Sequence, residues 1–329
     1  NGFRRSLLKS INGIVVEVPF SEAWTLAEDD RVRWVEPALP QFNDLNDSNR
    51  VITEVDEVQD SPYGLDGEGV VVMVYDGGYA YSGHQDFGGR LTTRDDAGTS
   101  DHATHVAGTI GGDGAASAGQ YTGMAPAVTI ESYGFQQDGG LQEGFLYTDP
   151  GDLEADYSDA INNHGAVISN ISIGTNTAPN GFPCEWTGDY GVTSSLIDGV
   201  VRGDLGAPMR IVWANGNERQ TDRCGNLYFT TAPPACAKNH ITVGAMNSND
   251  DTVTYFTSWG PSDDGRIKPD ISAPGCQSDG DGGVTSTSSS GGYSTKCGTS
   301  MASPTACGIG ALLIQDHRNQ YPDAPEMAN

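Results

Sequence analysis

The chain has 329 residues, of which 36% are hydrophobic, so it can form one large domain or two ordinary ones with a sizeable core. Forty-four acidic and 17 basic residues give a net charge of −27 at pH 7. Long-range repulsion then argues against nucleic acid and against an anionic membrane as partners. No segment is long and apolar enough to span a membrane. No signal-peptide pattern begins at Asn1, so we expect any leader to have been removed or to lie outside this sequence.

The chain contains six cysteines and no C-x-x-C pair, which argues against a zinc ribbon. An even number in a domain of this size predicts up to three disulfides, and therefore an oxidising, extracellular compartment. The positions along the chain predict two pairs, Cys276 with Cys297 and Cys184 with Cys224. The first pair flanks a loop, and the second brackets a strand. Cys307 lies in an apolar segment, as a buried free thiol or as the partner of Cys236.

The first 40 or so residues form a separate unit in the sequence pattern. Ile11–Val18 is predicted to be a strand, Ser21 the cap of a short helix, and Arg31–Glu36 a returning strand that two prolines stop. A β-α-β piece of this size is too small to be stable alone. A polar linker rich in Asn and Asp follows at Asn43–Arg50.

From Gly67 onward, apolar runs alternate with helical patterns. The predicted strands are Val70–Tyr75, Val128–Tyr133, Ala166–Ile173, Met209–Ala214 and Ile241–Ala245. Helices are predicted to begin at His102 and to cover Leu153–Asn163, Thr193–Arg202 and the apolar run Ala306–Ile314. This alternation predicts an α/β fold, with a parallel sheet covered by helices on both faces. Thr285–Gly292 is interpreted as a low-complexity Ser/Thr/Gly loop.

A serine lies among small residues in Gly298–Pro304, just ahead of the last apolar run. A serine hydroxyl is a poor nucleophile unless a base lies beside it, and a helix start would fix its position and favour developing negative charge. On this stretch alone, Ser300 can equally be a helix cap. The α/β-hydrolase elbow G-x-S-x-G is excluded, because Ala302 stands where that motif has its second glycine.

Polar residues also follow three of the predicted strands, where the chemistry of parallel sheets collects. They are Asp76, Asn217 and the segment Ser172-Ile173-Gly174. A lone carboxylate at a strand end, such as Asp76, is often only a turn former.

Two histidines three residues apart, His102 and His105, open the next helix. A metal pair would need a third ligand, and none has clear spacing, so His105 is interpreted as a buried structural residue. Asp76, His102 and Ser300 together supply an orienting carboxylate, a base and a nucleophile. We therefore expect a catalytic role for His102.

The order Asp, His, Ser along the chain is that of subtilisin. With it, the chain resembles the subtilisin-like serine proteases (subtilases) over roughly residues 50 to 315. Four blocks carry the resemblance: Val72–Gly78, His102–Gly108, Ala214–Glu218 and Gly298–Pro304. Three more resemble the large alkaline, oxidatively stable branch of the family: Phe256–Pro261, Arg266–Asp270 and Ala273–Gly275. The implied fold is a three-layer sandwich with a mainly parallel central sheet.

The resemblance implies a role for each site residue. Asp76 would orient His102, which would act as general base and then general acid, while Ser300 would be the nucleophile that forms an acyl-enzyme. Asn217 would donate its amide to the oxyanion, a contact worth roughly 3 to 4 kcal/mol when measured in a subtilisin. The substrate-binding residues would be Ser172, Ile173, Gly174 and Gly216, with the strand segment pairing with an extended peptide.

Three positions depart from the family pattern. Gly77 follows the aspartate where Ser or Thr is usual, Ala103 follows the histidine where Gly is usual, and Trp259 replaces a common Arg. None of these changes removes a chemical group from the mechanism. They bear on rate and on the shape of the substrate pocket.

The resemblance also predicts two domains. Residues 1–42 resemble the C-terminal half of a subtilase propeptide, a partial α+β unit that would inhibit the enzyme, and residues 43–329 would be a peptidase domain truncated at its C-terminus. The implied protein is a secreted, monomeric zymogen that acts on proteins or peptides. It needs no cofactor for catalysis, and structural calcium is expected, for which Asp279-Gly280-Asp281 is one source of oxygen ligands. The competing hypotheses are a catalytically inactive, subtilase-like peptide-binding module and an esterase without the usual elbow.

Overall fold

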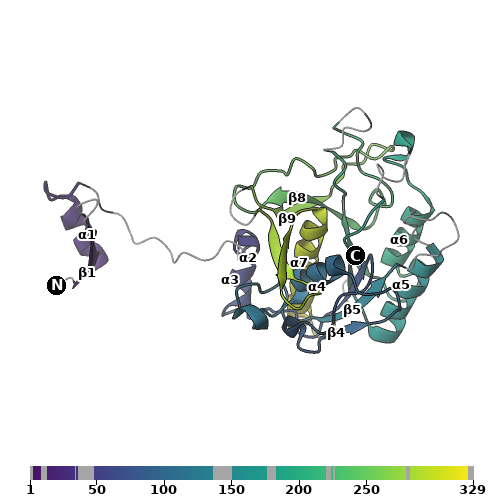
Figure 1. Cartoon of the computed structure of the whole chain (residues 1–329), viewed down its shortest axis with the longest axis horizontal. Helices are drawn as coiled ribbons and strands as arrows, with labels where there is room; N and C mark the ends of the chain where they lie inside the picture. Colours follow the sequence, from purple (N-terminus) through teal and green to yellow (C-terminus); the bar gives the residue numbers. More distant parts are fainter. Residues whose placement is uncertain are drawn as a thin grey trace. The chain divides into compact units, whose positions relative to one another are not determined.

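The computed structural model describes residues 3–8, 13–33, 35, 48–135, 150–175, 183–219, 224, 227–278 and 282–324. The chain divides into two compact units, residues 1–44 and 45–329 (Figure 1), and each is described by itself. Within the described residues, no helix has the length and apolar character needed to cross a membrane.

The N-terminal unit is a hairpin followed by a helix. Strands β1 (Phe3–Leu8) and β2 (Gly13–Glu17) pair antiparallel, and α1 (Phe20–Ala27) follows. The predicted β-α-β order is wrong for the described residues, because a strand, β1, comes before β2 and pairs with it. The arginines and the serine of β1 break its apolar pattern, so sequence patterning missed this strand. Ser21 lies inside α1, whose N-cap is Pro19.

The strand predicted over Arg31–Glu36 is wrong for the described residues 31–33 and 35. The chain turns there instead, since the Val32 amide donates to the Asp29 carbonyl and the Arg31 guanidinium bonds the Asp29 carboxylate. Trp34 and Glu36 lie outside the described residues.

The larger unit is built on a seven-stranded sheet. Its strands are β3 (Val71–Asp76), β4 (Leu91–Thr93), β5 (Thr129–Gly134), β6 (Ile168–Ile171), β7 (Arg210–Ala214), β8 (Ile241–Asn247) and β9 (Ile271–Cys276). They lie in the order β4-β5-β3-β6-β7-β8-β9, and all neighbouring pairs are parallel. The predicted parallel sheet is confirmed. Sequence patterning missed its two edge strands, of which β4 has three residues and β9 contains a proline.

Helices cover both faces of this sheet. The principal ones are α4 (Asp101–Gly111), α5 (Pro150–His164), α6 (Val192–Arg202) and α7 (Thr299–Gln320). Alternate residues of β3 divide the core: Val72 and Val74 pack with α4 and α7, while Met73 and Tyr75 pack with α5 and α6. The predicted three-layer α/β architecture is confirmed.

Short helical segments complete the unit. They are α2 (Ser48–Ile52), α3 (Val55–Gln59) and the 3-10 turns Gln85–Phe87, Ala115–Ser117 and Cys184–Trp186.

The segment expected to be a low-complexity loop, Thr285–Gly292, covers three residues of a strand and the turn of a β-hairpin. Strands β10 (Val284–Thr287) and β11 (Tyr293–Lys296) pair antiparallel, and β10 packs against α4. The Ser286 hydroxyl donates to the carbonyl of His105 at 2.8 Å, and the Thr287 hydroxyl donates to that of Thr104 at 2.7 Å. Hydroxyl side chains that look like a loop composition therefore fasten a strand to a helix.

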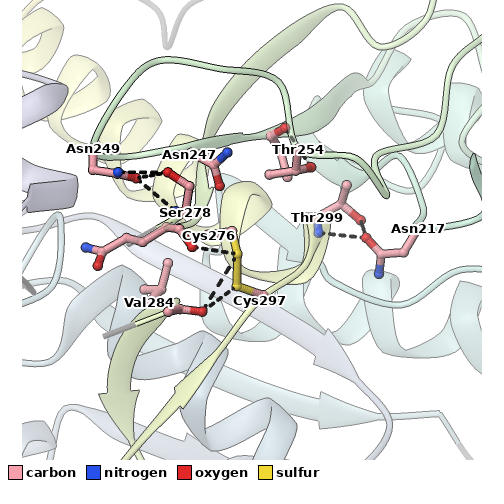
Figure 2. The surroundings of a disulfide bond; sticks show 12 residues. Asn217, Asn247, Asn249, Thr254, Cys276, Ser278, Val284, Cys297 and Thr299 are labelled. Carbon is pink, nitrogen blue, oxygen red and sulfur yellow. Dashed lines mark hydrogen bonds between the residues drawn. A yellow bond between two sulfur atoms is a disulfide. The ribbon is translucent and has the colours of Figure 1, made fainter. Parts of the chain in front are cut away.

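Both predicted disulfides are present. Cys184 pairs with Cys224, and Cys276 pairs with Cys297 (Figure 2). Cys236 and Cys307 are buried free thiols, so of the two alternatives for Cys307 the structure has the unpaired one. The second disulfide joins the end of β9 to the segment that leads into α7.

Candidate active site

Asp76 and His102 meet at the carboxyl end of β3. Asp76 is the last residue of that strand and is fully buried, and its Oδ1 accepts the Gly77 amide at 2.7 Å. His102 is the second residue of α4, and its Nδ1 lies 2.7 Å from the same Oδ1. Its side chain is 36% exposed. Because the carboxylate can only accept, Nδ1 carries the hydrogen and donates it to Asp76, and Nε2 is left as the basic nitrogen.

The environment tunes the imidazole of His102. Burial lowers its pKa, but the charge of Asp76 and the hydrogen bond to it raise the pKa by more, so the net shift is upward. Two further charges act in opposite directions, since Lys296 lowers this pKa and Asp101 raises it. The protonated form of His102 is thereby favoured beside the buried carboxylate.

Ser300 is held at the end of the neighbouring strand. Its hydroxyl donates to the Ser172 carbonyl at 2.7 Å, and the Ser172 hydroxyl donates to the Ser300 carbonyl at 2.9 Å. Tyr75 pairs with Ile171, so Asp76 at the end of β3 and Ser172 just after β6 lie beside each other on strands about 4.8 Å apart. The pairing register thus places the predicted aspartate, histidine and serine near the carboxyl ends of two adjacent central strands, β3 and β6. Within the described residues, the Ser300 hydroxyl has no hydrogen bond to His102.

A buried polar chain, which sequence reasoning missed, supports Ser172. The side-chain Nδ2 of Asn170 donates to the Ser172 hydroxyl at 2.8 Å, and the side-chain Oδ1 of Asn170 accepts from the Ser303 hydroxyl at 2.7 Å. Asn170 and Ser303 have no exposed surface. The polar pair Ser169-Asn170 within a buried strand was the available signal, because such groups need partners.

Asn217 is oriented by the first residue of α7. Its Oδ1 accepts the amide of Thr299 at 3.0 Å and the hydroxyl of Thr299 at 3.1 Å (Figure 2). These two donors identify the oxygen end of the side chain, so the Nδ2 end is the one that can donate. A Cβ on Gly298 would lie 3.4 Å from Nδ2 and 3.5 Å from the Ser300 amide nitrogen. Glycine therefore leaves open the space beside these two donors.

The predicted substrate-binding residues differ in what they offer. Ile173 and Gly174 follow β6 and make no hydrogen bond with the rest of the described chain, and Gly174 is exposed. Gly216, by contrast, donates its amide to the Thr299 hydroxyl at 3.2 Å and accepts the Ser258 amide at 2.9 Å. Its φ of +102° is one that favours glycine. The backbone groups of Gly216 are thus occupied within the fold, and a Cβ there would lie 3.1 Å from the Ser258 hydroxyl, whereas Ile173 and Gly174 offer backbone groups to a ligand.

His105 is buried, and its Nε2 lies 2.9 Å from the Val284 carbonyl oxygen. Burial lowers its pKa to about 3, so it stays neutral at ordinary pH, as expected for a structural histidine. The part of the chain that the structure describes holds no group of three or more His, Cys, Asp or Glu residues fit for a metal ion. The loop Asp279–Asp281 lies outside the described residues, so the calcium expectation stays a prediction.

The comparison with known families agrees with this geometry. The sequence model of the Subtilase family matches residues 67–328. The chain belongs to the subtilase family. This is a family of serine proteases, which are hydrolases, and the predicted subtilisin-like fold is confirmed. The finer assignment to the alkaline, oxidatively stable branch stays a prediction.

Curated relatives of this subtilase include three named proteases. They are "Alkaline serine exoprotease A" of Vibrio alginolyticus (28% identical, covering 96% of this chain and 54% of that protein), "Serine protease AprX" of Bacillus subtilis (31%, 79% and 60%) and "Extracellular serine proteinase" of Thermus sp. (30%, 93% and 67%). The chain thus spans little more than half the length of the first two.

Solved structures agree on the fold. A cold-adapted subtilisin-like serine proteinase is 28% identical with a TM-score of 0.54, covering 78% of this chain and 80% of its own. The CspB protease of Clostridium perfringens has a TM-score of 0.67 at 18% identity, with coverages of 84% and 89%. The second likeness concerns the fold alone.

Proposed function

We propose that this subtilase is a secreted serine endopeptidase that hydrolyses peptide bonds through an acyl-enzyme intermediate. One observation carries the proposal: the Asp76–His102 hydrogen bond of 2.7 Å lies at the end of β3, and the Ser300 hydroxyl is held by Ser172 just past the end of the neighbouring strand β6. A carboxylate bonded to an imidazole, with a serine hydroxyl at the adjacent strand end, has the composition of a Ser-His-Asp triad. The names of the curated relatives support the same reaction class.

The proposed reaction begins with proton transfer. The Ser300 hydroxyl turns from the Ser172 carbonyl toward Nε2 of His102, which takes its proton as Oγ attacks the scissile carbonyl carbon. Asp76 keeps Nδ1 protonated and stabilises the imidazolium, consistent with the raised pKa of His102. His102 then gives its proton to the leaving amine. A water molecule, activated by the same imidazole, hydrolyses the acyl-enzyme.

The oxyanion of each tetrahedral intermediate would lie beside Gly298. Two donors face this space, the Nδ2 of Asn217 and the amide of Ser300 at the start of α7. Both are oriented before the reaction, Asn217 by its two hydrogen bonds from Thr299, so little reorganisation is required as charge develops.

The substrates would be proteins or peptides bound as extended strands along Ser172, Ile173 and Gly174. The backbone groups of Ile173 and Gly174 make no hydrogen bond to other described residues, which suits strand addition. The propeptide-like residues 1–42 would occupy the same edge as an inhibitor. We propose a monomer that binds neither nucleic acid nor membrane, in keeping with its net charge of −27.

Two disulfides and a relative named as extracellular support secretion. No cofactor takes part in the proposed reaction, and calcium, where bound, would stabilise the fold.

Cleavage-site mapping on a denatured protein by mass spectrometry tests the proposal. The wild type should produce internal peptides, and Ser300→Ala should not. Binding of unfolded substrate without any Ser300-dependent cleavage would contradict the proposal and favour the inactive peptide-binding module. A matched panel of peptide amides and esters separates a peptidase from an esterase.

A further inference from the structure

An ion pair joins the two chain segments that carry His102 and Ser300. Asp101 is the first residue of α4 and immediately precedes His102, while Lys296 ends β11, four residues before Ser300. The Lys296 Nζ lies 2.9 Å from Oδ2 of Asp101. The two residues are 195 positions apart in sequence, so their contact is set by the tertiary fold.

The other oxygen of Asp101 is also fully engaged. Its Oδ1 accepts the Ser288 hydroxyl at 2.8 Å, the Ser289 amide at 2.9 Å and the Ser289 hydroxyl at 3.0 Å. These donors come from the turn between β10 and β11. One carboxylate therefore ties the turn after β10 and the last residue of β11 to the start of α4.

This role is distinct from capping the helix. The cap of α4 is Ser100, whose hydroxyl accepts the Ala103 amide at 3.1 Å. The side chain of Asp101 points to the hairpin instead. The side chains of Asp101 and Lys296 are 41% and 29% exposed. Like other partly exposed ion pairs, this one should therefore add little to the free energy of unfolding. Its effect lies in geometry.

A second constraint explains why this geometry matters for Ser300. Lys296 is followed by Cys297, which the disulfide ties to Cys276, and then by Gly298, whose amide donates to the Gly275 carbonyl at 3.0 Å. The segment from Lys296 to α7 is thus fastened at successive residues. A shift of Lys296 relative to α4 would change the distance between the imidazole and the serine hydroxyl.

We propose that Asp101 and Lys296 are positioning residues, which hold the start of α4 and the segment entering α7 in the register that proton transfer from Ser300 to His102 requires. This inference rests on the proposed peptidase function. Proton transfer depends steeply on the separation of the two groups, and a misplacement of about 1 Å can cost on the order of 100-fold in rate.

The pair also leaves an electrostatic signature at His102. The charged or titratable groups around this imidazole are Asp76 from β3, Lys296 from β11, and Asp101 and His105 from α4. Lys296 lowers the pKa of His102, and Asp101 raises it. Removing either charge alone should therefore shift the acid limb of kcat/KM in opposite directions, upward for Lys296→Met and downward for Asp101→Asn, whereas removing both should largely restore it.

The experiment compares these variants in the full chain, with kcat referred to active sites titrated by a fluorophosphonate. Lys296→Met and Asp101→Asn should each lower kcat by about tenfold or more, with KM changed by less than about threefold. The double variant should be no slower than the slower single one, because the two residues act together. Lys296→Arg, which keeps the charge and the reach, should retain most of the activity.

Arg202→Met is the matched control, since it removes a surface ion pair with Asp204 far from these elements in sequence and should leave kcat unchanged. The positioning role would be overturned if kcat per titrated site stayed within twofold of wild type in both single variants, even if their melting temperatures fell. An inactive wild type that also fails to react with the fluorophosphonate would overturn the proposed function, and the positioning role with it.

Discussion

Nδ1 of His102 lies 2.7 Å from the buried Oδ1 of Asp76, which joins the start of α4 to the end of β3. This contact outweighs the effect of burial and raises the pKa of the imidazole. The base must be neutral to accept a proton, so kcat/KM should rise with pH through a midpoint above the ordinary histidine value of about 6.5. The same raised pKa stabilises the fold below about pH 6.5, and this stabilisation is lost as pH rises through the folded-state pKa.

Asp76→Asn removes the charge and no longer enforces the productive tautomer of His102. The expected result is a loss in kcat of about 10⁴-fold and a lower midpoint for the acid limb. Measurement of kcat/KM between pH 5 and pH 9, chosen to bracket a histidine at about 6.5, checks both. Retention of kcat within tenfold would contradict the assigned role of Asp76.

Asn217→Ala removes one proposed oxyanion donor and leaves the other, the Ser300 amide at the start of α7, in place. Because this donor acts on charge that develops only during reaction, kcat should fall by about 10²- to 10³-fold with little change in KM. Thr299→Val is a graded control: the variant keeps the backbone donor to Asn217 and loses only the hydroxyl, so its loss should be smaller. If Asn217→Ala raised KM by as large a factor as it lowered kcat, the result would argue for a role in ground-state binding instead.

The Cys276–Cys297 disulfide closes a loop with a sequence separation of 21 residues directly before Ser300. Replacing both cysteines by alanine should lower the free energy of unfolding by about 3 kcal/mol on the chain-entropy model, and should also reduce kcat. Removal of the Cys184–Cys224 disulfide, with a separation of 40, should cost a similar amount in stability. Chemical denaturation measures the stabilities, and non-reducing peptide mapping that joined Cys276 elsewhere would disprove the pairing.

The N-terminal unit should be released by self-cleavage. The unit carries more large apolar side chains than a free tail would, among them Val16, Trp24 and Val32. A piece this small cannot bury them by itself. We expect the wild type to cut itself in the polar linker around Gln41–Asn49 and Ser300→Ala to stay intact. N-terminal sequencing of both proteins reads the result directly. A fully active wild type that remained uncut would show that residues 1–42 are a permanent structural arm.

The layered architecture could be predicted from the sequence because buried parallel strands leave a strong signal. β3 is apolar up to Asp76 and β7 is apolar from Ile211 to Ala214 with Asn215 next, and the segments between them include stretches with the apolar spacing of helices. The hairpin β10–β11 left no such signal, since its strands are fastened to α4 by hydroxyl groups that also suit a loop. In the N-terminal unit, β1 was hidden by its arginines.

Residues in recognisable motifs at strand and helix ends, such as Asp76, His102 and Ser300, could be selected from the sequence as candidates, and their catalytic roles stay predictions. Their supporting partners could not be selected in this way. Asn170 and Ser303 lie 133 residues apart, and only the fold brings their side chains within 2.7 Å. Motifs therefore identify reactive groups, whereas the contacts that hold those groups depend on tertiary pairing.

The central claim is that His102 activates Ser300 as a nucleophile. Its most direct test is reaction of the full chain with a fluorophosphonate, followed by intact-mass measurement and peptide mapping. The account predicts a single adduct on Ser300 in the wild type, loss of the adduct in Ser300→Ala, and slowing by several orders of magnitude in His102→Ala. An unmodified wild type, or labelling that persisted at the same rate in His102→Ala, would contradict it.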